Sequence, residues 1–374
     1  MAQHPDVAII GGGIIGLTAA YFLAKAGAAV AVYERGDFGK EASWAGAGIL
    51  PPGNPDRAAT PADKLRGIGS HRFPEFSNEL RALTGIDNGY RRSGGIEFLA
   101  PEDADVPGVW AAEGISFERV SLADAKKFEP LGDVDGEPYL LPGCAQVRNP
   151  WHLRALTAAC AQIGVHLYHT AGVEAWEFDH TRIGALRLVS GERAVAGRFL
   201  LAAGAWSEKL LHALGHRPHV HPVRGQIALL RGASCSRVLM AGKRYLVPRG
   251  DGLTLVGSTE EPEAGFEKRT TAEGIAGLLD FARQTVPVLA SATLETSWAG
   301  LRPGSPDGRP FIGPVRGWDN VVVAAGHFRA GVQLSIGTAQ AVTELLTGQP
   351  TCVPLEAFAP DRKPGTNAKC AFRS

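Results

Sequence analysis

The strongest constraint on the fold lies near the N-terminus, in residues 7–34. This segment begins with a short run of mostly β-branched apolar residues and continues into the spacing G-x-G-x-x-G, formed by Gly11, Gly13 and Gly16. Apolar residues then recur at helical spacing, and a second apolar run ends at Glu34. This order predicts a strand buried on both faces, a tight turn, a helix and a second strand.

The glycines and the terminal acid predict a dinucleotide site. Gly11 permits the tight turn, Gly13 lets the backbone approach a pyrophosphate, and Gly16 lets the helix pack closely on the strand. The free N–H groups and positive end of the helix would meet the phosphates. Glu34 follows at nearly the ~20-residue spacing typical of an acid that accepts hydrogen bonds from ribose hydroxyls. The alternative is a glycine-rich turn without a ligand, but the complete strand–helix–strand context favours NAD or FAD.

The composition describes a globular enzyme rather than a nucleic-acid or membrane protein. The 374 residues allow two domains and a large core. Lys+Arg and Asp+Glu both number 38, so no excess basic charge indicates a nucleic-acid or anionic membrane partner. No apolar stretch reaches the ~20 residues of a membrane span. The five cysteines lack C-x-x-C spacing and the first six residues lack a basic signal region, so we expect reduced thiols and a cytoplasmic location.

Hydrophobic patterning along the chain predicts a discontinuous nucleotide domain. Helical periodicity covers residues 62–84, 150–163, 271–286 and 331–346, and short apolar runs predict strands between them. We expect residues 1–85, 145–217 and 297–374 to form the dinucleotide-binding domain, and residues 86–144 and 218–296 to form a substrate-binding domain. The tail, residues 360–374, is expected to be loosely held.

Three further segments allow two interpretations each. Residues 43–49 and 202–205 consist mostly of small side chains, which could let the backbone lie against a flat ring or a phosphate, or could simply form a loop and a strand–helix corner. Four histidines between residues 212 and 221 could suggest a metal site. No Cys or Asp stands at ligand spacing and two prolines interrupt the segment, so surface histidines and no metal are expected.

Later motifs indicate a family. The segments LAAGAW, PVRGQ, RYLVPRG, GLRPGSPDGRPFIG and AAGHFRAGV follow the opening dinucleotide unit in this order. In this arrangement, which covers nearly the whole chain, the sequence resembles the D-amino-acid oxidase family of flavoproteins, and within it the glycine oxidase group.

The resemblance implies an α/β fold with a Rossmann-like FAD domain and a substrate domain built on a mixed, largely antiparallel sheet. It implies FAD bound non-covalently, because no cysteine lies in the turn expected at Gly300 to Pro303. It implies oxidation of glycine, sarcosine or small D-amino acids by hydride transfer from Cα to flavin N5, with O2 reduced to H2O2 and the imine available for thiamine thiazole synthesis. The family also implies a homo-oligomer, often a tetramer. A D-amino-acid dehydrogenase with a quinone acceptor, an NAD-dependent dehydrogenase and a non-catalytic nucleotide-binding protein remain alternatives.

The resemblance also implies roles for individual residues. Arg302 matches the family's carboxylate-binding arginine, and Tyr245 matches the tyrosine that shares that carboxylate, although a surface turn arginine is the alternative for Arg302. A bidentate guanidinium suits a carboxylate on general chemical grounds. Arg329 is expected near the substrate amine. Arg244 departs from the family pattern and is expected at the mouth of the substrate pocket, and Ile49 is expected to contact the substrate.

The remaining expectations concern the cofactor. The helix that starts near Gly331 should direct its N-terminus toward the pyrimidine end of the flavin, where negative charge develops on reduction. His327 is expected to be a packing residue with one hydrogen bond rather than a base. The full set expected to bind the cofactor is Gly11, Gly13, Ile14, Ile15, Gly16, Glu34, Arg35, Ser43, Ala45, Gly46, Ala47, Gly48, Ile49, Val173, Ala203, Gly204, Trp206, Gly225, Arg302, His327, Phe328, Arg329, Gly331, Val332 and Gln333.

Overall fold

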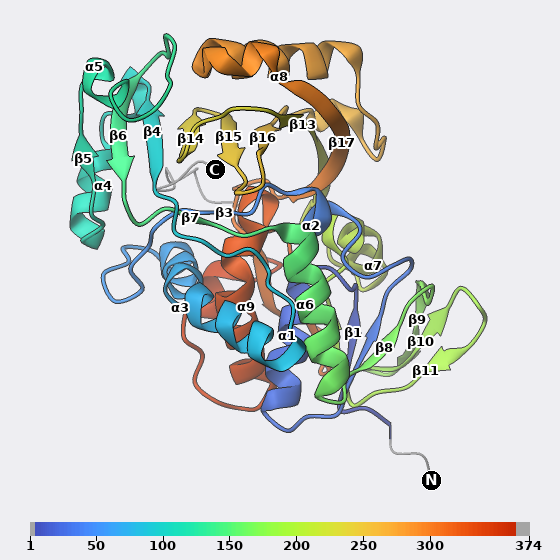
Figure 1. Ribbon diagram of the computed structural model, residues 1–374. Helices are drawn as coiled ribbons and strands as arrows, with labels where there is room; N and C mark the ends of the chain where they lie inside the picture. The colour runs from blue at the N-terminus through green and yellow to red at the C-terminus, as the bar shows by residue number, and fades with distance from the viewer. Residues whose placement is uncertain (1–3, 364–374) are drawn as a thin grey trace.

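The computed structural model describes residues 4–363 and consists of two sheet-based layers (Figure 1). The predicted loose tail falls mainly on residues 364–374, which lie outside the described residues. Within the described part, no helix combines the length and apolar character that crossing a bilayer requires.

A six-stranded sheet forms the centre of the lower part in Figure 1, with β1 as an inner strand. β1 pairs in parallel with β2 and β12, so that Val7 lies opposite both Val30 and Arg198. The strand order is β18-β19-β12-β1-β2-β8, and only the edge strand β18 runs antiparallel to its neighbour. The strands are β1 (Val7–Ile10), β2 (Val30–Tyr33), β8 (His166–Tyr168), β12 (Arg198–Leu201), β18 (Phe311–Pro314) and β19 (Val321–Ala325).

Alternate residues of this sheet enter two different cores. Val7 and Ile9 of β1 pack among the long helices, whereas Ala8 and Ile10 face a smaller antiparallel sheet and α7. Both faces of the strands are therefore covered, which explains why β1 and β2 read as uninterrupted apolar runs. The covering elements are α1 (Ile14–Lys25), α3 (Pro61–Thr84), α6 (Asn149–Gln162) and α9 (Gly331–Leu346) on one face, and α7 (Ser207–Ala213), β9 (Val173–Asp179), β10 (Arg182–Leu188) and β11 (Arg193–Ala194) on the other.

An eight-stranded mixed sheet forms the second layer, in the order β17-β13-β16-β15-β14-β4-β6-β5. All neighbours are antiparallel except β14 and β4. Helix α8 covers one face, and the other face looks toward the nucleotide part (Figure 1). The elements are β4 (Gly95–Leu99), β5 (Glu118–Arg119), β6 (Glu137–Leu141), β13 (His221–Arg231), β14 (Val238–Ala241), β15 (Arg244–Pro248), β16 (Leu253–Gly257), β17 (Thr293–Gly304), α4 (Val106–Glu113), α5 (Leu122–Ala125) and α8 (Ala272–Thr285).

Short elements lie between the longer helices and strands. β3 pairs with β7 beside the turn that follows α2. These elements are α2 (Ala42–Ala45), β3 (Ile49–Leu50), β7 (Ala145–Gln146) and the 3-10 turns η1 (Pro101–Asp103), η2 (Gly204–Trp206), η3 (Pro262–Ala264), η4 (Pro287–Ser291), η5 (Phe328–Ala330) and η6 (Leu355–Phe358).

The α/β class and the two-part architecture agree with the prediction, but one local expectation is wrong. Gly300–Pro303 is not a turn, because it lies inside β17, where Arg302 pairs with Val223 of β13. β17 is an edge strand, and an edge strand tolerates the missing N–H of Pro303. The predicted domain limits stay a prediction, and β17 crosses the limit placed at residue 297.

Candidate active site

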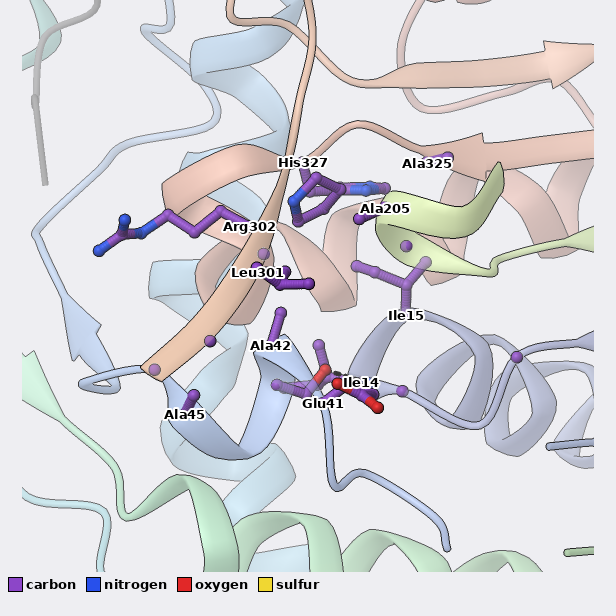
Figure 2. Close-up of a pocket in the computed structure, with 18 of the residues that line it drawn as sticks. Ile14, Ile15, Glu41, Ala42, Ala45, Ala205, Leu301, Arg302, Ala325 and His327 are labelled. Atoms are coloured by element: carbon purple, nitrogen blue, oxygen red, sulfur yellow. Dashed lines mark hydrogen bonds between the residues drawn. The ribbon is translucent and has the colours of Figure 1, made fainter. Parts of the chain in front are cut away.

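A long cavity lies where the carboxyl ends of β1, β12 and β19 meet the eight-stranded sheet. Figure 2 shows that small side chains such as Ala42, Ala45, Ala205 and Ala325 form much of its wall, with Arg302 toward one end. All residues expected to bind the cofactor line this cavity except Gly16, and Tyr245 lines it too. The structure thus brings residues from widely separated segments to one site.

Gly16 does not line the cavity but lies in the first turn of α1, against the turn at Gly11. A β-carbon at this position would stand 2.0 Å from the carbonyl oxygen of Gly11, so only glycine lets α1 pack this closely on the preceding turn. Gly11 itself has φ +107°, a conformation that suits glycine. The turn therefore delivers the N-terminus of α1 to the cavity as the motif predicts.

Glu34 at the end of β2 holds the same turn through its carboxylate. Oε2 accepts the N–H of Gly12 at 2.8 Å, and Oε1 accepts the N–H of Gly36 at 3.0 Å. Each carboxylate oxygen keeps a further lone pair, so Glu34 can also accept from ribose hydroxyls. Beside it, the guanidinium carbon of Arg35 lies 3.6 Å from the ring centre of Trp206, and this stack forms a wall of the cavity.

Ser43 joins α2 to the start of α1. Its Oγ accepts the N–H of Ile14 at 2.9 Å, which satisfies one of the free donors of the helix. The hydroxyl hydrogen remains available to donate to an anion in the cavity.

The N-terminus of α9 lies at the opposite side of the cavity and has no side-chain cap. Gln333 uses its amide elsewhere, donating to the Pro51 carbonyl at 2.9 Å and to Ser70 Oγ at 2.7 Å. His327 is buried, with Nε2 3.1 Å from Thr338 Oγ1, which confirms the expected hydrogen bond. Burial lowers the pKa of His327 to about 3, so the imidazole is neutral.

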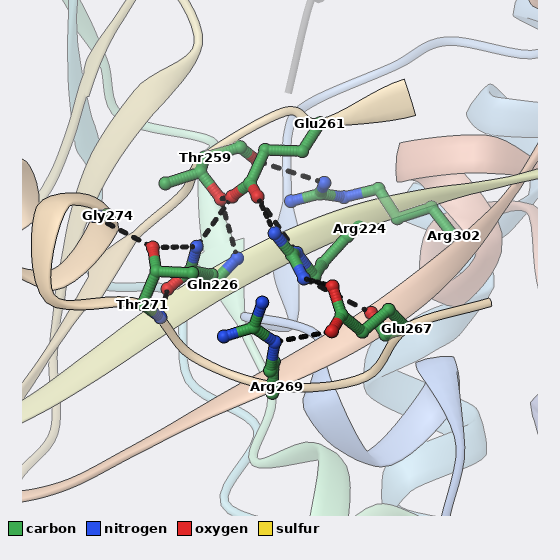
Figure 3. A network of polar contacts seen from close by, with 9 residues as sticks. All are labelled: Arg224, Gln226, Thr259, Glu261, Glu267, Arg269, Thr271, Gly274 and Arg302. Atoms are coloured by element: carbon green, nitrogen blue, oxygen red, sulfur yellow. Dashed lines mark hydrogen bonds and ion pairs between the residues drawn. The ribbon is translucent and has the colours of Figure 1, made fainter. Parts of the chain in front are cut away.

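Arg302 presents its guanidinium from β17 to the cavity, at the end where Tyr245 also lines it. Nη1 donates to the Thr259 carbonyl at 3.1 Å and Nη2 donates to Ser258 Oγ at 2.5 Å (Figure 3 shows the contact with Thr259). Burial lowers the pKa of Arg302, and the neighbouring Tyr245 opposes that shift. Within residues 4–363 no acidic side chain forms an ion pair with Arg302, so its positive charge has only neutral partners.

A partly buried polar network supports the segment that holds Arg302 (Figure 3). Gln226 donates its main-chain N–H to Thr259 Oγ1 at 2.9 Å and its side-chain amide to Glu261 at 2.7 Å. Glu261 also forms an ion pair with Arg224 at 2.5 Å. These contacts attach residues 259–261 to β13 and keep the carbonyl that faces Arg302 in place.

Arg329 differs from Arg302 because a carboxylate compensates its charge. Nη2 lies 2.5 Å and Nε 3.0 Å from Glu260 Oε2, and Lys243 contacts the other carboxylate oxygen at 2.7 Å. Burial opposes ionisation of Glu260, but the hydrogen bonds and charges of Lys243 and Arg329 outweigh it and lower its pKa. Arg329 lines the cavity, as expected, but with an internal counter-ion.

Arg244 does not lie where it was expected. It projects from the face of β15 opposite to Tyr245, donates to the Gly277 carbonyl at 3.2 Å and lies over the ring of Phe281 in α8. Adjacent residues of a strand point to opposite faces, so Tyr245 reaches the cavity and Arg244 cannot. The expectation that Arg244 occupies the pocket mouth is therefore wrong.

Sequence reasoning missed Ser258 and Glu260, although both follow directly after the buried strand β16. Polar residues at the end of a buried strand are a recognisable signal, but the pairing of Glu260 with Arg329 is not visible in the sequence. The histidines of the 212–221 segment contact neighbouring groups of the protein, such as the Arg316 carbonyl for His216. The described residues contain no cluster of three or more metal-ligating side chains, and the four cysteines among them are free thiols.

The chain is similar to known flavoproteins over nearly its whole length. Residues 6–345 match the family model described as FAD-dependent oxidoreductase. The chain is 35% identical over 365 residues to a glycine oxidase of Pseudomonas putida, covering 96% of this chain and 99% of that protein. It is 34% identical over 375 residues to the bifunctional protein ThiO/ThiG of Synechocystis sp., of which it covers 54%. The crystal structure of glycine oxidase from Geobacillus kaustophilus superimposes with a TM-score of 0.91 at 31% identity, covering 97% of this chain and all of that one.

Proposed function

Because the chain belongs to the family of FAD-dependent oxidoreductases, we propose that it is a glycine oxidase, which oxidises glycine and other small amino acids such as sarcosine and small D-amino acids. The observation that carries this proposal is the position of Arg302 and Tyr245 at the substrate end of the long cavity. Arg302 offers a positive charge held by neutral acceptors, which suits one substrate carboxylate.

The residues of the cavity fit FAD. Glu34 suits the ribose hydroxyls, the N-terminus of α1 suits the pyrophosphate, and the uncapped N-terminus of α9 suits the end of the flavin where negative charge develops. When bound, FAD supplies the two-electron acceptor for the hydride that leaves the substrate Cα. The stack of Arg35 on Trp206 would cover the nucleotide portion.

The protein's own contribution to the reaction is positioning. Arg302 and Tyr245 would bind the carboxylate and fix the orientation of Cα, and Arg329 would lie toward the amine. His327 is neutral and bonded to Thr338, so it supplies packing rather than a positive charge. Hydride loss requires the neutral amine, and no general base is needed once the amine has lost its proton.

The product connects to a further proposal. Relatives that join ThiO to ThiG in one chain support a role for the imine in thiamine thiazole synthesis. A cytoplasmic location, expected from the sequence, and a homo-oligomer, with a tetramer expected from the family, remain predictions. Cell fractionation and light scattering of the purified protein test them.

The decisive experiment is a substrate panel on the purified yellow protein. Glycine, sarcosine and D-alanine are expected to bleach the flavin absorbance without oxygen and to yield hydrogen peroxide in air. Bleaching without peroxide would instead favour a dehydrogenase with a quinone acceptor. A protein that stays colourless with added FAD, or that none of these amino acids bleaches, would contradict the proposal.

A further inference from the structure

The two arginines at the substrate end have partners of different charge. Arg302 donates to a carbonyl and a hydroxyl, both neutral, whereas Arg329 donates twice to the carboxylate of Glu260. Both sets of partners come from residues 258–260, the segment that follows β16. This short segment therefore gives Arg302 only neutral acceptors and gives Arg329 a negatively charged one.

Glu260 acts on the cavity through Arg329, which lines it. Its side chain is 21% exposed and that of Arg329 is 11% exposed, so solvent screens their interaction only in part. Residues 258 and 259 contact Arg302 and residue 260 contacts Arg329, so the two guanidinium groups and the Glu260 carboxylate lie along one short stretch of chain. Lys243 holds the second oxygen of Glu260, but its own side chain is 69% exposed and stays largely in solvent.

The charges at this end of the cavity thus match a substrate with one carboxylate. A second carboxylate carried on the substrate nitrogen would approach Arg329. The carboxylate of Glu260 is already bonded to that guanidinium and would repel the second substrate carboxylate. We propose that Glu260 is a specificity-determining residue, which acts as an internal counter-ion to Arg329 and excludes N-carboxymethyl amino acids while admitting glycine and N-methylglycine. This inference rests on the proposed function, which directs the substrate amine toward Arg329.

The substitution Glu260→Gln tests this directly. Glutamine keeps the volume and one acceptor oxygen, so Arg329 retains a hydrogen bond from residue 260 but no longer faces a negative charge there. Iminodiacetate is N-carboxymethylglycine, and sarcosine is its counterpart with a methyl group in place of the carboxymethyl group. We expect the ratio of kcat/KM for iminodiacetate to kcat/KM for sarcosine to rise about 10- to 100-fold, the effect of one charge-assisted hydrogen bond.

Two further variants separate specificity from general damage. Glu295→Gln makes the same change on β17, where Glu295 pairs with Arg231 away from the cavity, and it should leave the ratio at the wild-type value. In the double variant Glu260→Gln/Arg329→Met, the gain for iminodiacetate should disappear, because the cation that binds the second carboxylate is gone.

A binding measurement supplies a readout that does not depend on turnover. Diglycolate and methoxyacetate are ethers that reproduce iminodiacetate and sarcosine without the oxidisable amine, and calorimetry on the FAD-loaded protein gives their Kd values. Glu260→Gln should tighten diglycolate relative to methoxyacetate by the same factor of about 10 to 100. Unchanged ratios in kinetics and calorimetry, with sarcosine still oxidised, would overturn the role of Glu260 alone. A wild-type protein that oxidises glycine but not sarcosine would overturn this inference alone, whereas one that oxidises none of glycine, sarcosine and D-alanine would overturn the proposed function and this inference with it.

Discussion

The guanidinium of Arg302 lies directly against the backbone of Gly225. A β-carbon at residue 225 would stand 2.2 Å from Nη1 and 2.4 Å from Cζ of Arg302, far inside van der Waals contact. Gly257 lies in the same way against Tyr245, with its β-carbon position 2.6 Å from the hydroxyl oxygen. Both polar side chains of the substrate end are thus packed on glycines in neighbouring strands, where a ligand or side chain approaches the backbone closely.

Gly225→Ala should displace Arg302 without unfolding the protein, because the group in contact is the far end of a flexible side chain. We expect the KM for glycine to rise about 10-fold or more, which corresponds to ~1.4 kcal/mol, with a small change in Tm. Steady-state kinetics and thermal unfolding measure the two effects. Gly108→Ala in α4 is the matched control, since no atom lies within 4 Å of its added methyl group. An unchanged KM in Gly225→Ala would show that the position of Arg302 does not matter.

Arg302→Ala should remove most of the carboxylate recognition. The expected loss in kcat/KM for glycine is ~1.5–3 kcal/mol, the contribution of a hydrogen bond to a charged group. Arg302→Lys should retain part of the affinity, because lysine keeps the charge but lacks the planar fork. Arg231→Ala, which removes an exposed ion pair with Glu295, serves as the control. A loss below ~1 kcal/mol in Arg302→Ala would contradict the assignment.

The nucleotide end of the cavity could be predicted in detail because its determinants are local. β1, the turn at Gly11, α1 and Glu34 follow one another in the chain, and each obeys the rule for its position. The contacts made by Glu34 and Ser43 add detail to this picture without changing it.

The arrangement of residues around Arg302 was harder to predict from the sequence, because it depends on pairings between segments that are distant in the chain. Pro303 suggested a turn, and only the sheet order reveals that β17 is an edge strand that can carry it. The pairing of Glu260 with Arg329 joins residues 69 positions apart, and no local pattern announces it. The orientation of Arg244, by contrast, could have been predicted from the sequence, because adjacent residues of a strand such as β15 point to opposite faces and Arg244 is next to Tyr245.

Some motif residues turn out to support the fold rather than the chemistry. Asp307 of the PDGR segment is nearly buried and receives hydrogen bonds from Arg309 and Arg362, with Arg362 bonded at 2.9 and 2.7 Å. Arg362 thereby fastens the segment after η6 to the loop before β18. Asp307 and Arg302 belong to the same sequence motif, which does not say which of them has a structural role. Their contacts do, because Asp307 is bonded to two arginines and Arg302 lines the cavity.

Glu34→Gln should weaken FAD binding without altering the chemistry. Glutamine has one acceptor oxygen where glutamate has two, so one of the Gly12 and Gly36 N–H groups loses its partner and the ribose loses an anionic acceptor. We expect the Kd for FAD to rise about 10-fold or more, with kcat at saturating FAD unchanged. The fluorescence of released FAD on dilution measures this affinity. Glu174→Gln, which only disrupts an exposed pair with Arg187, should bind FAD as the wild type does. A fall in kcat of the fully loaded Glu34→Gln protein would contradict the assignment of Glu34 to the far end of the cofactor.

Two buried histidines predict that the protein loses stability in mild acid. Burial lowers the pKa of His152 to about 4 and that of His327 to about 3, against about 6.5 for the unfolded chain. Below pH ~6.5 the unfolded state therefore takes up protons that the folded state does not, and the free energy of unfolding falls until the pH reaches the folded-state values. Each histidine should contribute a loss on the order of 1–2 kcal/mol between about pH 7 and pH 5. For Asp307, burial would raise the pKa, but Arg362 and Arg309 lower it to about 2, so the stability that this carboxylate contributes is lost only in stronger acid.

Urea unfolding of the protein at about pH 7 and pH 5 measures this dependence. In His152→Gln the free energy of unfolding should fall less between about pH 7 and pH 5, by the amount that one histidine contributes, because glutamine binds no proton in this range. The glutamine can still hydrogen bond to the side-chain amide of Asn88, which lies 3.1 Å from His152 Nδ1. His180→Gln, a change at a side chain that is 95% exposed, should keep the wild-type dependence. Equal slopes in the wild type and His152→Gln would mean that His152 takes up its proton in the folded state as readily as in the unfolded chain.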